Sequence, residues 1–254
     1  MDRSILKKKL RKGPAFGTFI NLPAACMPEI IALAGYDFAI IDLEHAGIND
    51  DVAEAMLRSA DIHGLPIVVR PRELNRAYVL RAFDQGASAI QVPQLDTVAE
   101  AELAVKYGKY PPHGVRGVCA TRASAFGLTF SDYLKNANDD LTTIVHCETK
   151  AFLDIIEEAV KVPGLDCIFL GPYDLSVSLG YPGDIDHPVV KDAIKHFAAV
   201  CNEFGMITGI YVRDAADAKM RIEQGFRYIA YSVDVFLMLE KYTAFMKDMK
   251  KGMV

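Results

Sequence analysis

Short apolar runs alternate with longer segments of helical periodicity along the chain, and the order of the two is kept throughout. The apolar runs have the length of strands and cover residues 15–21, 38–43, 66–70, 88–92, 142–147, 167–171, 207–212 and 228–232. The main helical segments cover residues 51–63, 97–107, 151–161, 188–204, 215–224 and 235–250. The pattern predicts eight strands that alternate with helices.

One short connection is repeated before six of the predicted strands. In each case a glycine ends the helical segment and an apolar run follows; the glycines are Gly35, Gly64, Gly86, Gly164, Gly205 and Gly225. Glycine readily adopts the left-handed conformation that caps a helix, so these positions indicate one reused helix-to-strand joint. Buried strands that are each followed by a helix form a parallel sheet, and units of about 32 residues favour a closed (β/α)8 barrel. A doubly wound open sheet is the alternative.

The segment 108–140 interrupts this alternation between the fourth and fifth strands. Its first part, KYPPHGVRGVCATRASAFG, is rich in proline and glycine and predicts a long loop. A loop of this length on a barrel covers the active site or forms a subunit contact. No linker or low-complexity tract divides the chain, so we expect residues 1–254 to form a single barrel domain.

Composition narrows the possible partners and the compartment. With 51% hydrophobic and 24% charged residues, the chain can bury a large core. A net charge of −5 gives no broad basic surface, so we expect no nucleic-acid partner. No apolar run approaches the roughly 20 residues of a membrane helix, and no signal peptide is recognisable, so we expect a cytoplasmic protein. The five scattered cysteines form no C-x-x-C pair and indicate reduced thiols rather than a zinc site.

Ionisable residues end several predicted strands, which is where the active sites of barrels lie. They follow the second, third, fifth and sixth strands and are Asp42, Glu44, His45, Arg70, His146, Glu148 and Asp174. Glu148 and Asp174 end consecutive strands, so in a parallel barrel both carboxylates can reach one cation. Two carboxylates, with water and substrate oxygens as the other ligands, are typical of Mg²⁺ or Mn²⁺. The alternative is that each carboxylate caps the helix that follows it.

The second and third strands end in residues suited to acid–base and anion chemistry. His45 lies within one turn of chain of Asp42 and Glu44, and a neighbouring carboxylate can fix the tautomer of an imidazole and raise its basicity. From the spacing alone, a loop histidine bonded to backbone is the stronger explanation. Arg70 ends an apolar strand, where an unpaired guanidinium is costly to bury. This placement favours stabilisation of a developing oxyanion, with an exit to solvent as the alternative.

Seven motifs occur in an order and spacing that resemble a known enzyme family. They are FAIIDLEHAGIND, PIVVRP, AIQVPQLDTVAEAELAV, KYPPHGVRGV, TRAS, IVHCET and GPYDLS, within residues 12–240. The chain resembles the class II pyruvate aldolases of the 4-hydroxy-2-oxoheptanedioate aldolase (HpcH/HpaI) family. The resemblance implies a (β/α)8 TIM barrel of the phosphoenolpyruvate/pyruvate type. It also implies reversible cleavage of a 4-hydroxy-2-oxo acid, of the hydroxy-oxoheptanedioate or 2-dehydro-3-deoxy-aldarate type, to pyruvate and an aldehyde.

The resemblance also assigns roles to individual residues. Glu148 and Asp174 become the ligands of a divalent Mg, Mn or Co ion, and His45 becomes the base. Arg70 stabilises the enolate oxygen. Asp84, to which the residues alone give no role, raises the basicity of the histidine from a neighbouring subunit. These roles match a retro-aldol step, which needs one base and one electron sink.

Substrate contacts are implied at three further positions. The backbone at Tyr173 and Asp174 receives the pyruvyl carboxylate, and position 146 touches the substrate. The chain departs from the family pattern at two of these positions. His146 stands where better-known members carry glutamine, and it adds a possible charge or a third metal ligand. Tyr173 stands where a small residue is usual, so we expect a narrower pocket or a phenol facing the aldehyde.

Two alternative functions and an oligomeric state are also considered. Lys150 lies two residues after Glu148 and would be the nucleophile of a Schiff-base aldolase, although its position indicates the first turn of a helix. A barrel that binds an oxo acid without catalysis is the alternative from another class. The family resemblance implies a homohexamer in which the C-terminal helix, residues 235–250, is exchanged between subunits.

Overall fold

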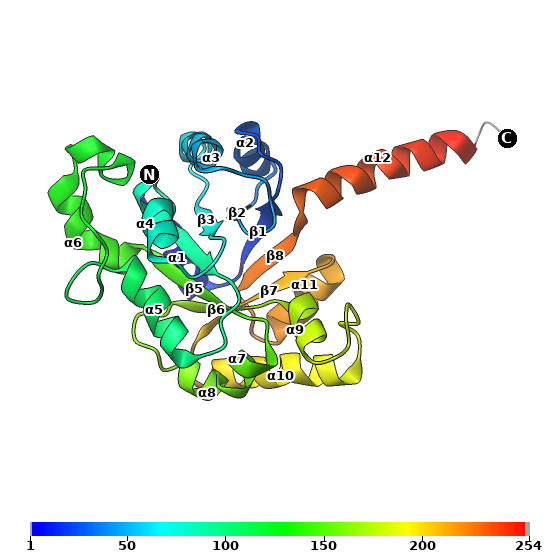
Figure 1. Cartoon of the computed structure of the whole chain (residues 1–254). Coiled ribbons are helices and arrows are strands. Elements are labelled where there is room, and N and C mark those ends of the chain that lie inside the picture. The colour runs from blue at the N-terminus through cyan, green and yellow to red at the C-terminus, as the bar shows by residue number, and fades with distance from the viewer. Residues whose placement is uncertain (1, 252–254) are drawn as a thin grey trace.

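Eight parallel strands close into a barrel in the computed structural model, which describes residues 2–251 (Figure 1). The strands are β1 (Ala15–Ile20), β2 (Phe38–Asp42), β3 (Ile67–Arg70), β4 (Ala89–Val92), β5 (Thr142–Cys147), β6 (Cys167–Leu170), β7 (Ile207–Val212) and β8 (Tyr228–Val233). Each strand pairs with the next along the chain, and β8 pairs with β1. The prediction of a (β/α)8 barrel is confirmed, and the open sheet is excluded.

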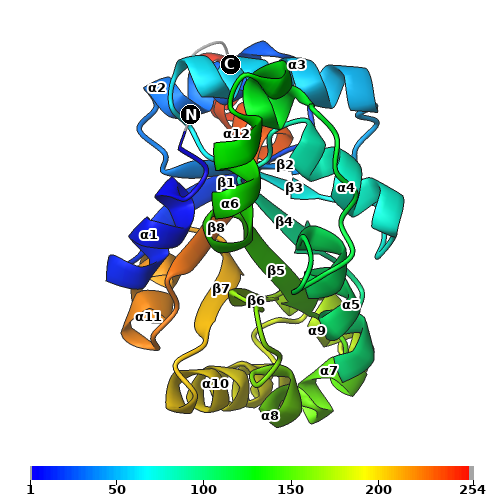
Figure 2. The same cartoon turned by 90° about the vertical axis from the view of Figure 1, so that its left-hand side faces the viewer.

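Helices follow the strands and surround the barrel (Figure 2). They are α1 (Ile5–Lys12), α2 (Cys26–Leu33), α3 (Asp50–Ile62), α4 (Arg76–Asp84), α5 (Val98–Gly108), α6 (Phe130–Asp140), α7 (Lys150–Asp154), α8 (Ile156–Ala159), α9 (Pro172–Ser178), α10 (Pro188–Glu203), α11 (Ala215–Glu223) and α12 (Asp234–Lys251). The predicted helix at 151–161 is divided into α7 and α8, because Ile155 leaves helical geometry with φ −109° and ψ 16°.

The repeated glycine joint is present as predicted. All six glycines have φ between +67° and +99°; they are Gly35, Gly64, Gly86, Gly164, Gly205 and Gly225. A side chain is strained in this left-handed region, whereas glycine is not. The same backbone turn therefore returns the chain from helix to strand at six places around the barrel.

The segment 108–140 is only in part the loop that its composition predicts. It contains a tight irregular turn, η1 (Arg122–Gly127), and then the regular helix α6. The Asn138 side chain binds both the backbone N–H and the carbonyl of Tyr110. Lys109 donates to the carbonyls of Asn138 and Leu141. These contacts hold α6 against the end of α5, an interaction that the proline and glycine content did not indicate.

The interior of the barrel is aromatic and is closed at its amino-terminal end. Phe38 and Tyr228 stack with ring centroids 4.3 Å apart. Leu6 and Leu10 of α1 are buried in the same apolar cluster as these rings. Because α1 occupies this end, the open end of the barrel is the one formed by the carboxyl ends of the strands.

Helix α12 projects away from the barrel (Figure 1). After Asp234, none of its residues up to Lys251 is buried. Its large exposed apolar side chains are Phe236, Met238, Leu239, Tyr242, Phe245, Met246 and Met249. Within residues 2–251, no helix is long and apolar enough to cross a membrane. The apolar face of α12 is therefore uncovered within one chain.

Candidate active site

A cavity of about 270 Å³ opens at the carboxyl ends of the strands. Seven of the eight predicted site residues line it, and they are Asp42, His45, Arg70, His146, Glu148, Tyr173 and Asp174. They come from strands β2, β3, β5 and β6 or from the segments that directly follow these strands. The barrel thus brings together residues that are more than 130 positions apart in the sequence.

Arg70 is held between two carboxylates at the end of β3. Its Nε lies 2.9 Å from Asp42 Oδ1, and one of its terminal nitrogens lies 2.6 Å from Asp42 Oδ2. The other terminal nitrogen is 3.1 Å from Glu44 Oε2. Burial alone would lower the pKa of Arg70, but Asp42 and Glu44 raise it above its ordinary value. The guanidinium is therefore a fixed positive charge in the wall of the cavity.

His45 lies at the mouth of the cavity with its side chain 58% exposed. The Asp42 carboxylate accepts the backbone N–H groups of Glu44 and His45, so it shapes the loop that carries the imidazole. The carboxylate beside the ring itself is that of Glu44, 3.6 Å from Nε2. Burial raises the pKa of Glu44 although Arg70 and His45 oppose this shift. The imidazole is thus accessible and has Glu44, rather than Asp42, as its carboxylate neighbour.

Glu148 and Asp174 face the same small space beside Gly171. Glu148 Oε2 and Asp174 Oδ2 lie 3.0 and 3.8 Å from the point that a Cβ on Gly171 would occupy. A larger residue at 171 would fill the space between the two carboxylates. Within residues 2–251 no group of three or more His, Cys, Asp and Glu side chains is arranged to hold a metal ion. Two hard oxygen ligands with room for water or substrate fit Mg²⁺ or Mn²⁺.

Glu148 is held in its ionised form. Burial alone would raise the pKa of Glu148. His146, the backbone N–H of Gln94 and the charge of Arg70 outweigh this effect and lower the pKa to about 2 from an ordinary value of 4.5. The Gln94 N–H donates to Glu148 Oε1 at 2.6 Å. The Gln94 side chain also donates to Glu44 Oε1 at 2.7 Å, which links the two carboxylates across the site. A metal ligand must be deprotonated, and Glu148 meets this requirement.

His146 uses both ring nitrogens inside the protein. Nδ1 lies 2.6 Å from Glu148 Oε2, and Nε2 lies 2.7 Å from Gln91 Nε2. The structure therefore does not bring His146 into place as a third metal ligand. Gln91 and Gln94 were missed in the sequence. The only available signal for Gln91 was its position as a polar residue between Ile90 and Val92 in the buried run AIQV.

Comparison with known proteins identifies the family. The family model for HpcH/HpaI aldolase/citrate lyase matches residues 15–240. The chain belongs to this family. It is 36% identical to a hydroxypyruvate/pyruvate aldolase of Paraburkholderia phytofirmans, over 92% of this chain and 93% of the relative. It is 33% identical to a 2-keto-3-deoxy-L-rhamnonate aldolase of Escherichia coli, over 97% of this chain and 94% of the relative.

The solved structures agree with this assignment. An HpcH/HpaI aldolase/citrate lyase family protein from Burkholderia cenocepacia superposes with a TM-score of 0.93 at 36% identity. The match covers 97% of this chain and 99% of that one. The barrel is therefore shared with a solved member of the HpcH/HpaI family.

Two predicted residues of this HpcH/HpaI chain lie away from the cavity. Asp84 ends α4, and its Oδ1 lies 2.7 Å from a terminal nitrogen of Arg116. Its action on a histidine of a neighbouring subunit stays a prediction. Lys150 is the first residue of α7, as the sequence indicated, and its exposed Nζ pairs with Asp154. Schiff-base lysines typically lie in a desolvated, apolar pocket, whereas Lys150 is exposed and paired with Asp154.

Two tyrosine side chains form part of the cavity lining. Tyr173 and Tyr211 line it, and their rings meet edge to face with centroids 5.7 Å apart. Burial raises the pKa of Tyr211, so its phenol stays protonated in the neutral range. The cavity is therefore lined by aromatic rings as well as by charged groups.

Proposed function

We propose that this HpcH/HpaI family member is a divalent-metal-dependent aldolase that reversibly cleaves a 4-hydroxy-2-oxo acid to pyruvate and an aldehyde. Its substrate is of the hydroxy-oxoheptanedioate or 2-dehydro-3-deoxy-aldarate type. The observation that carries the proposal is the meeting of His45, Arg70 and the Glu148–Asp174 pair in one cavity. Aldolase names among its relatives support the same reaction class.

The cation would be held by Glu148 and Asp174. Their shared space beside Gly171 and the ionised state of Glu148 support this assignment. When bound, an Mg, Mn or Co ion supplies a Lewis acid that draws electron density from the 2-oxo group. The backbone N–H groups at Tyr173 and Asp174, at the start of α9, are proposed to receive the substrate carboxylate.

His45 and Arg70 perform the proton and charge steps. His45, directly or through water, accepts the proton of the C4 hydroxyl as the C3–C4 bond breaks. C4 then becomes the aldehyde carbonyl, and the electron pair of the broken bond passes to C3 and the C2 oxygen. Arg70, fixed by Asp42 and Glu44, stabilises the negative charge on that oxygen. Protonation of C3 completes pyruvate.

The proposal also covers the assembly, which rests on the family resemblance, and the compartment. The proposed homohexamer has α12 exchanged between subunits, which would cover its exposed apolar face. Asp84 would act on His45 of a neighbouring subunit in this assembly. We place the protein in the cytoplasm, a compartment suited to its five free thiols.

Exchange of the methyl protons of pyruvate with D₂O, followed by NMR, tests the proposal. This exchange needs proton removal from C3 but no knowledge of the aldehyde. We expect exchange in the metal-loaded protein, loss on treatment with a chelator and recovery with Mg²⁺, Mn²⁺ or Co²⁺. Pyruvate binding without exchange would instead support a non-catalytic barrel. A borohydride-trapped pyruvate adduct on Lys150 would support the Schiff-base aldolase.

A further inference from the structure

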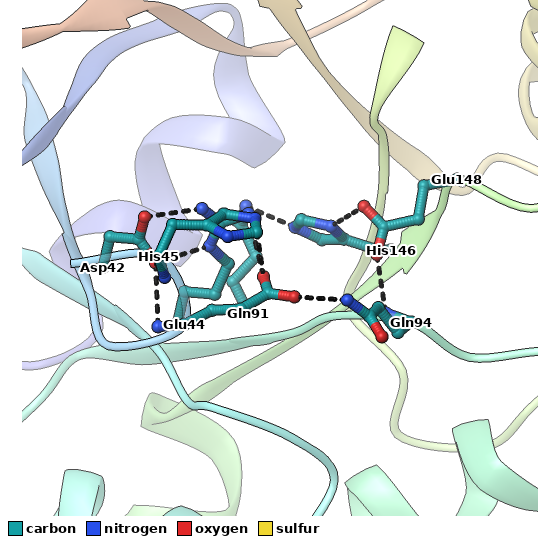
Figure 3. Close-up of polar contacts among 8 residues, drawn as sticks. Asp42, Glu44, His45, Gln91, Gln94, His146 and Glu148 are labelled. Carbon is teal, nitrogen blue, oxygen red and sulfur yellow. Dashed lines mark hydrogen bonds and ion pairs between the residues drawn. The ribbon is translucent and has the colours of Figure 1, made fainter. Parts of the chain in front are cut away.

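A chain of buried hydrogen bonds lies behind the Glu148 carboxylate and crosses the interior of the barrel. The Tyr228 hydroxyl of β8 donates to Gln91 Oε1 of β4 at 2.7 Å. Gln91 Nε2 lies 2.7 Å from His146 Nε2, and His146 Nδ1 lies 2.6 Å from Glu148 Oε2 (Figure 3). The four residues are between 0% and 4% exposed. We call the first three the Tyr228–Gln91–His146 chain.

The direction of each hydrogen bond follows from its neighbours. An ionised carboxylate only accepts, so His146 donates to Glu148 from Nδ1. A neutral imidazole then has a bare Nε2, which accepts from the Gln91 NH₂ group. Gln91 Oε1 is left as the acceptor for the Tyr228 hydroxyl. Every donor thus points along the chain toward Glu148, and the tautomer of His146 is set by residues on two other strands.

Packing restricts the same residues. The His146 ring lies against Phe169, with centroids 4.9 Å apart, and the Tyr228 ring stacks on Phe38. Glu148 is also held from the other side, because its second oxygen accepts the Gln94 backbone N–H. Each oxygen of Glu148 therefore has one fixed donor, and Oε2 also faces the space beside Gly171 that Asp174 Oδ2 shares.

We propose that the Tyr228–Gln91–His146 chain orients the Glu148 carboxylate for a divalent cation, and that His146 is a positioning residue rather than a hydrogen-bonding contact to the substrate. The inference rests on the metal site of the proposed function and adds its supporting residues. Groups that hydrogen-bond a metal ligand fix its orientation and tune its affinity. His146 has no free ring nitrogen to offer a substrate while both bonds persist, although its ring borders the cavity.

The affinity for Mn²⁺, measured by calorimetry on metal-free protein without substrate, tests the inference independently of turnover. His146→Phe keeps a planar ring but removes both nitrogens, and we expect Mn²⁺ binding to weaken by about 10- to 100-fold. His146→Asn keeps an N–H donor near the place of Nδ1 and should stay closer to wild type than to His146→Phe. Tyr228→Phe removes only the distant hydroxyl and should give a smaller loss of affinity in the same direction.

Ile144→Val is the matched control, because Ile144 is a buried apolar residue on β5 two positions before His146. It should leave Mn²⁺ affinity unchanged. Thermal unfolding midpoints establish that each variant is folded; if His146→Phe does not fold, Tyr228→Phe decides. Wild-type Mn²⁺ affinity in folded His146→Phe, or in Tyr228→Phe where His146→Phe is unfolded, overturns the inference.

The kinetics of pyruvate proton exchange separate positioning from substrate contact. If His146 only positions Glu148, the KM for pyruvate at saturating Mn²⁺ should change little in His146→Asn. A raised KM with unchanged Mn²⁺ affinity would show a direct substrate contact and overturn the inference. Absence of Mn²⁺ binding in the wild-type protein would instead contradict the metal site of the proposed function itself.

Discussion

Arg70 shows how much of the site depends on the geometry of one side chain. Its guanidinium bonds two oxygens of Asp42 at once and still reaches Glu44. Arginine has planar donors that match a carboxylate in two places, whereas lysine offers one compact charge. The role of Arg70 therefore depends on its shape as well as on its charge.

Arg70→Lys should lower the rate of pyruvate proton exchange by about 100-fold, the usual scale for a lost oxyanion donor. The charge is kept, but Asp42 and Glu44 can no longer fix it in one position. Arg72→Lys is the matched control, because Arg72 is 40% exposed and does not line the cavity. It should keep nearly wild-type exchange. Equal rates in Arg70→Lys and wild type would remove Arg70 from the mechanism.

Sequence reasoning found the site residues that can be recognised from their immediate neighbours in the sequence. His45, Arg70, Glu148 and Asp174 each follow an apolar run, and that position alone places them at the mouth of a barrel. Gln91 could not be found in this way. Its partners are 55 and 137 positions away, so its role depends on which strands meet across the interior.

The repeated element of the fold is the helix-to-strand joint, and its glycines carry a testable backbone requirement. Gly64 follows α3 with φ +67°, and an added Cβ would meet no atom within 4 Å. Gly64→Ala should therefore destabilise the fold by about 1–2 kcal/mol through backbone strain alone. Thermal or urea unfolding measures this loss.

Gly13→Ala supplies the control for the glycine joint. A Cβ added at Gly13 would also meet no atom within 4 Å, but the φ of 171° is an extended conformation that any residue can adopt. The substitution should leave stability unchanged or slightly higher, because alanine restricts the unfolded chain. An equal loss in both variants would mean that the left-handed turn is not what Gly64 supplies.

The buried amine of Lys109, next to the end of α5, binds backbone carbonyls of α6 and of the residue after it, and it has a lowered pKa. Burial, with a smaller contribution from Lys7, lowers the pKa of Lys109 to about 8 from an ordinary value of 10.5. Between these pH values the unfolded chain binds more protons than the folded one. Stability should therefore rise from pH 8 toward pH 10.5, with a total contribution of up to about 3 kcal/mol.

Lys109→Met removes this titration. The free energy of unfolding of wild type, relative to the variant, should increase as pH rises from 8 to 10 in urea titrations. Lys106→Met, an exposed change on α5, gives the background dependence on pH. If the difference in free energy of unfolding between wild type and Lys109→Met does not vary with pH, burial does not lower the pKa of Lys109.

At the scale of the whole molecule, the order of strands was predictable and the attachments outside the barrel were not. Alternation of apolar and helical segments sets each strand, and the helix that connects consecutive strands allows them to pair in parallel. The position of α12 has no such local signal. The turn after β8 decides whether the apolar face of α12 packs on its own barrel or on another chain. In the structure α12 points away from the barrel (Figure 1).

The outward α12 leads to the last prediction, which joins assembly and activity. We expect the full chain to have six times its 28.0 kDa mass in light scattering, and Leu239→Glu with Phe245→Glu to yield smaller species. Glu240→Gln, a polar change on the same helix, should keep the assembly.

The smaller species also test whether Asp84 acts across a subunit contact. If it does, they should lose proton exchange but bind Mn²⁺ normally, because Glu148 and Asp174 belong to one chain. Full exchange in a monomer would show that one chain holds the complete site and that Asp84 has no role in a neighbouring subunit.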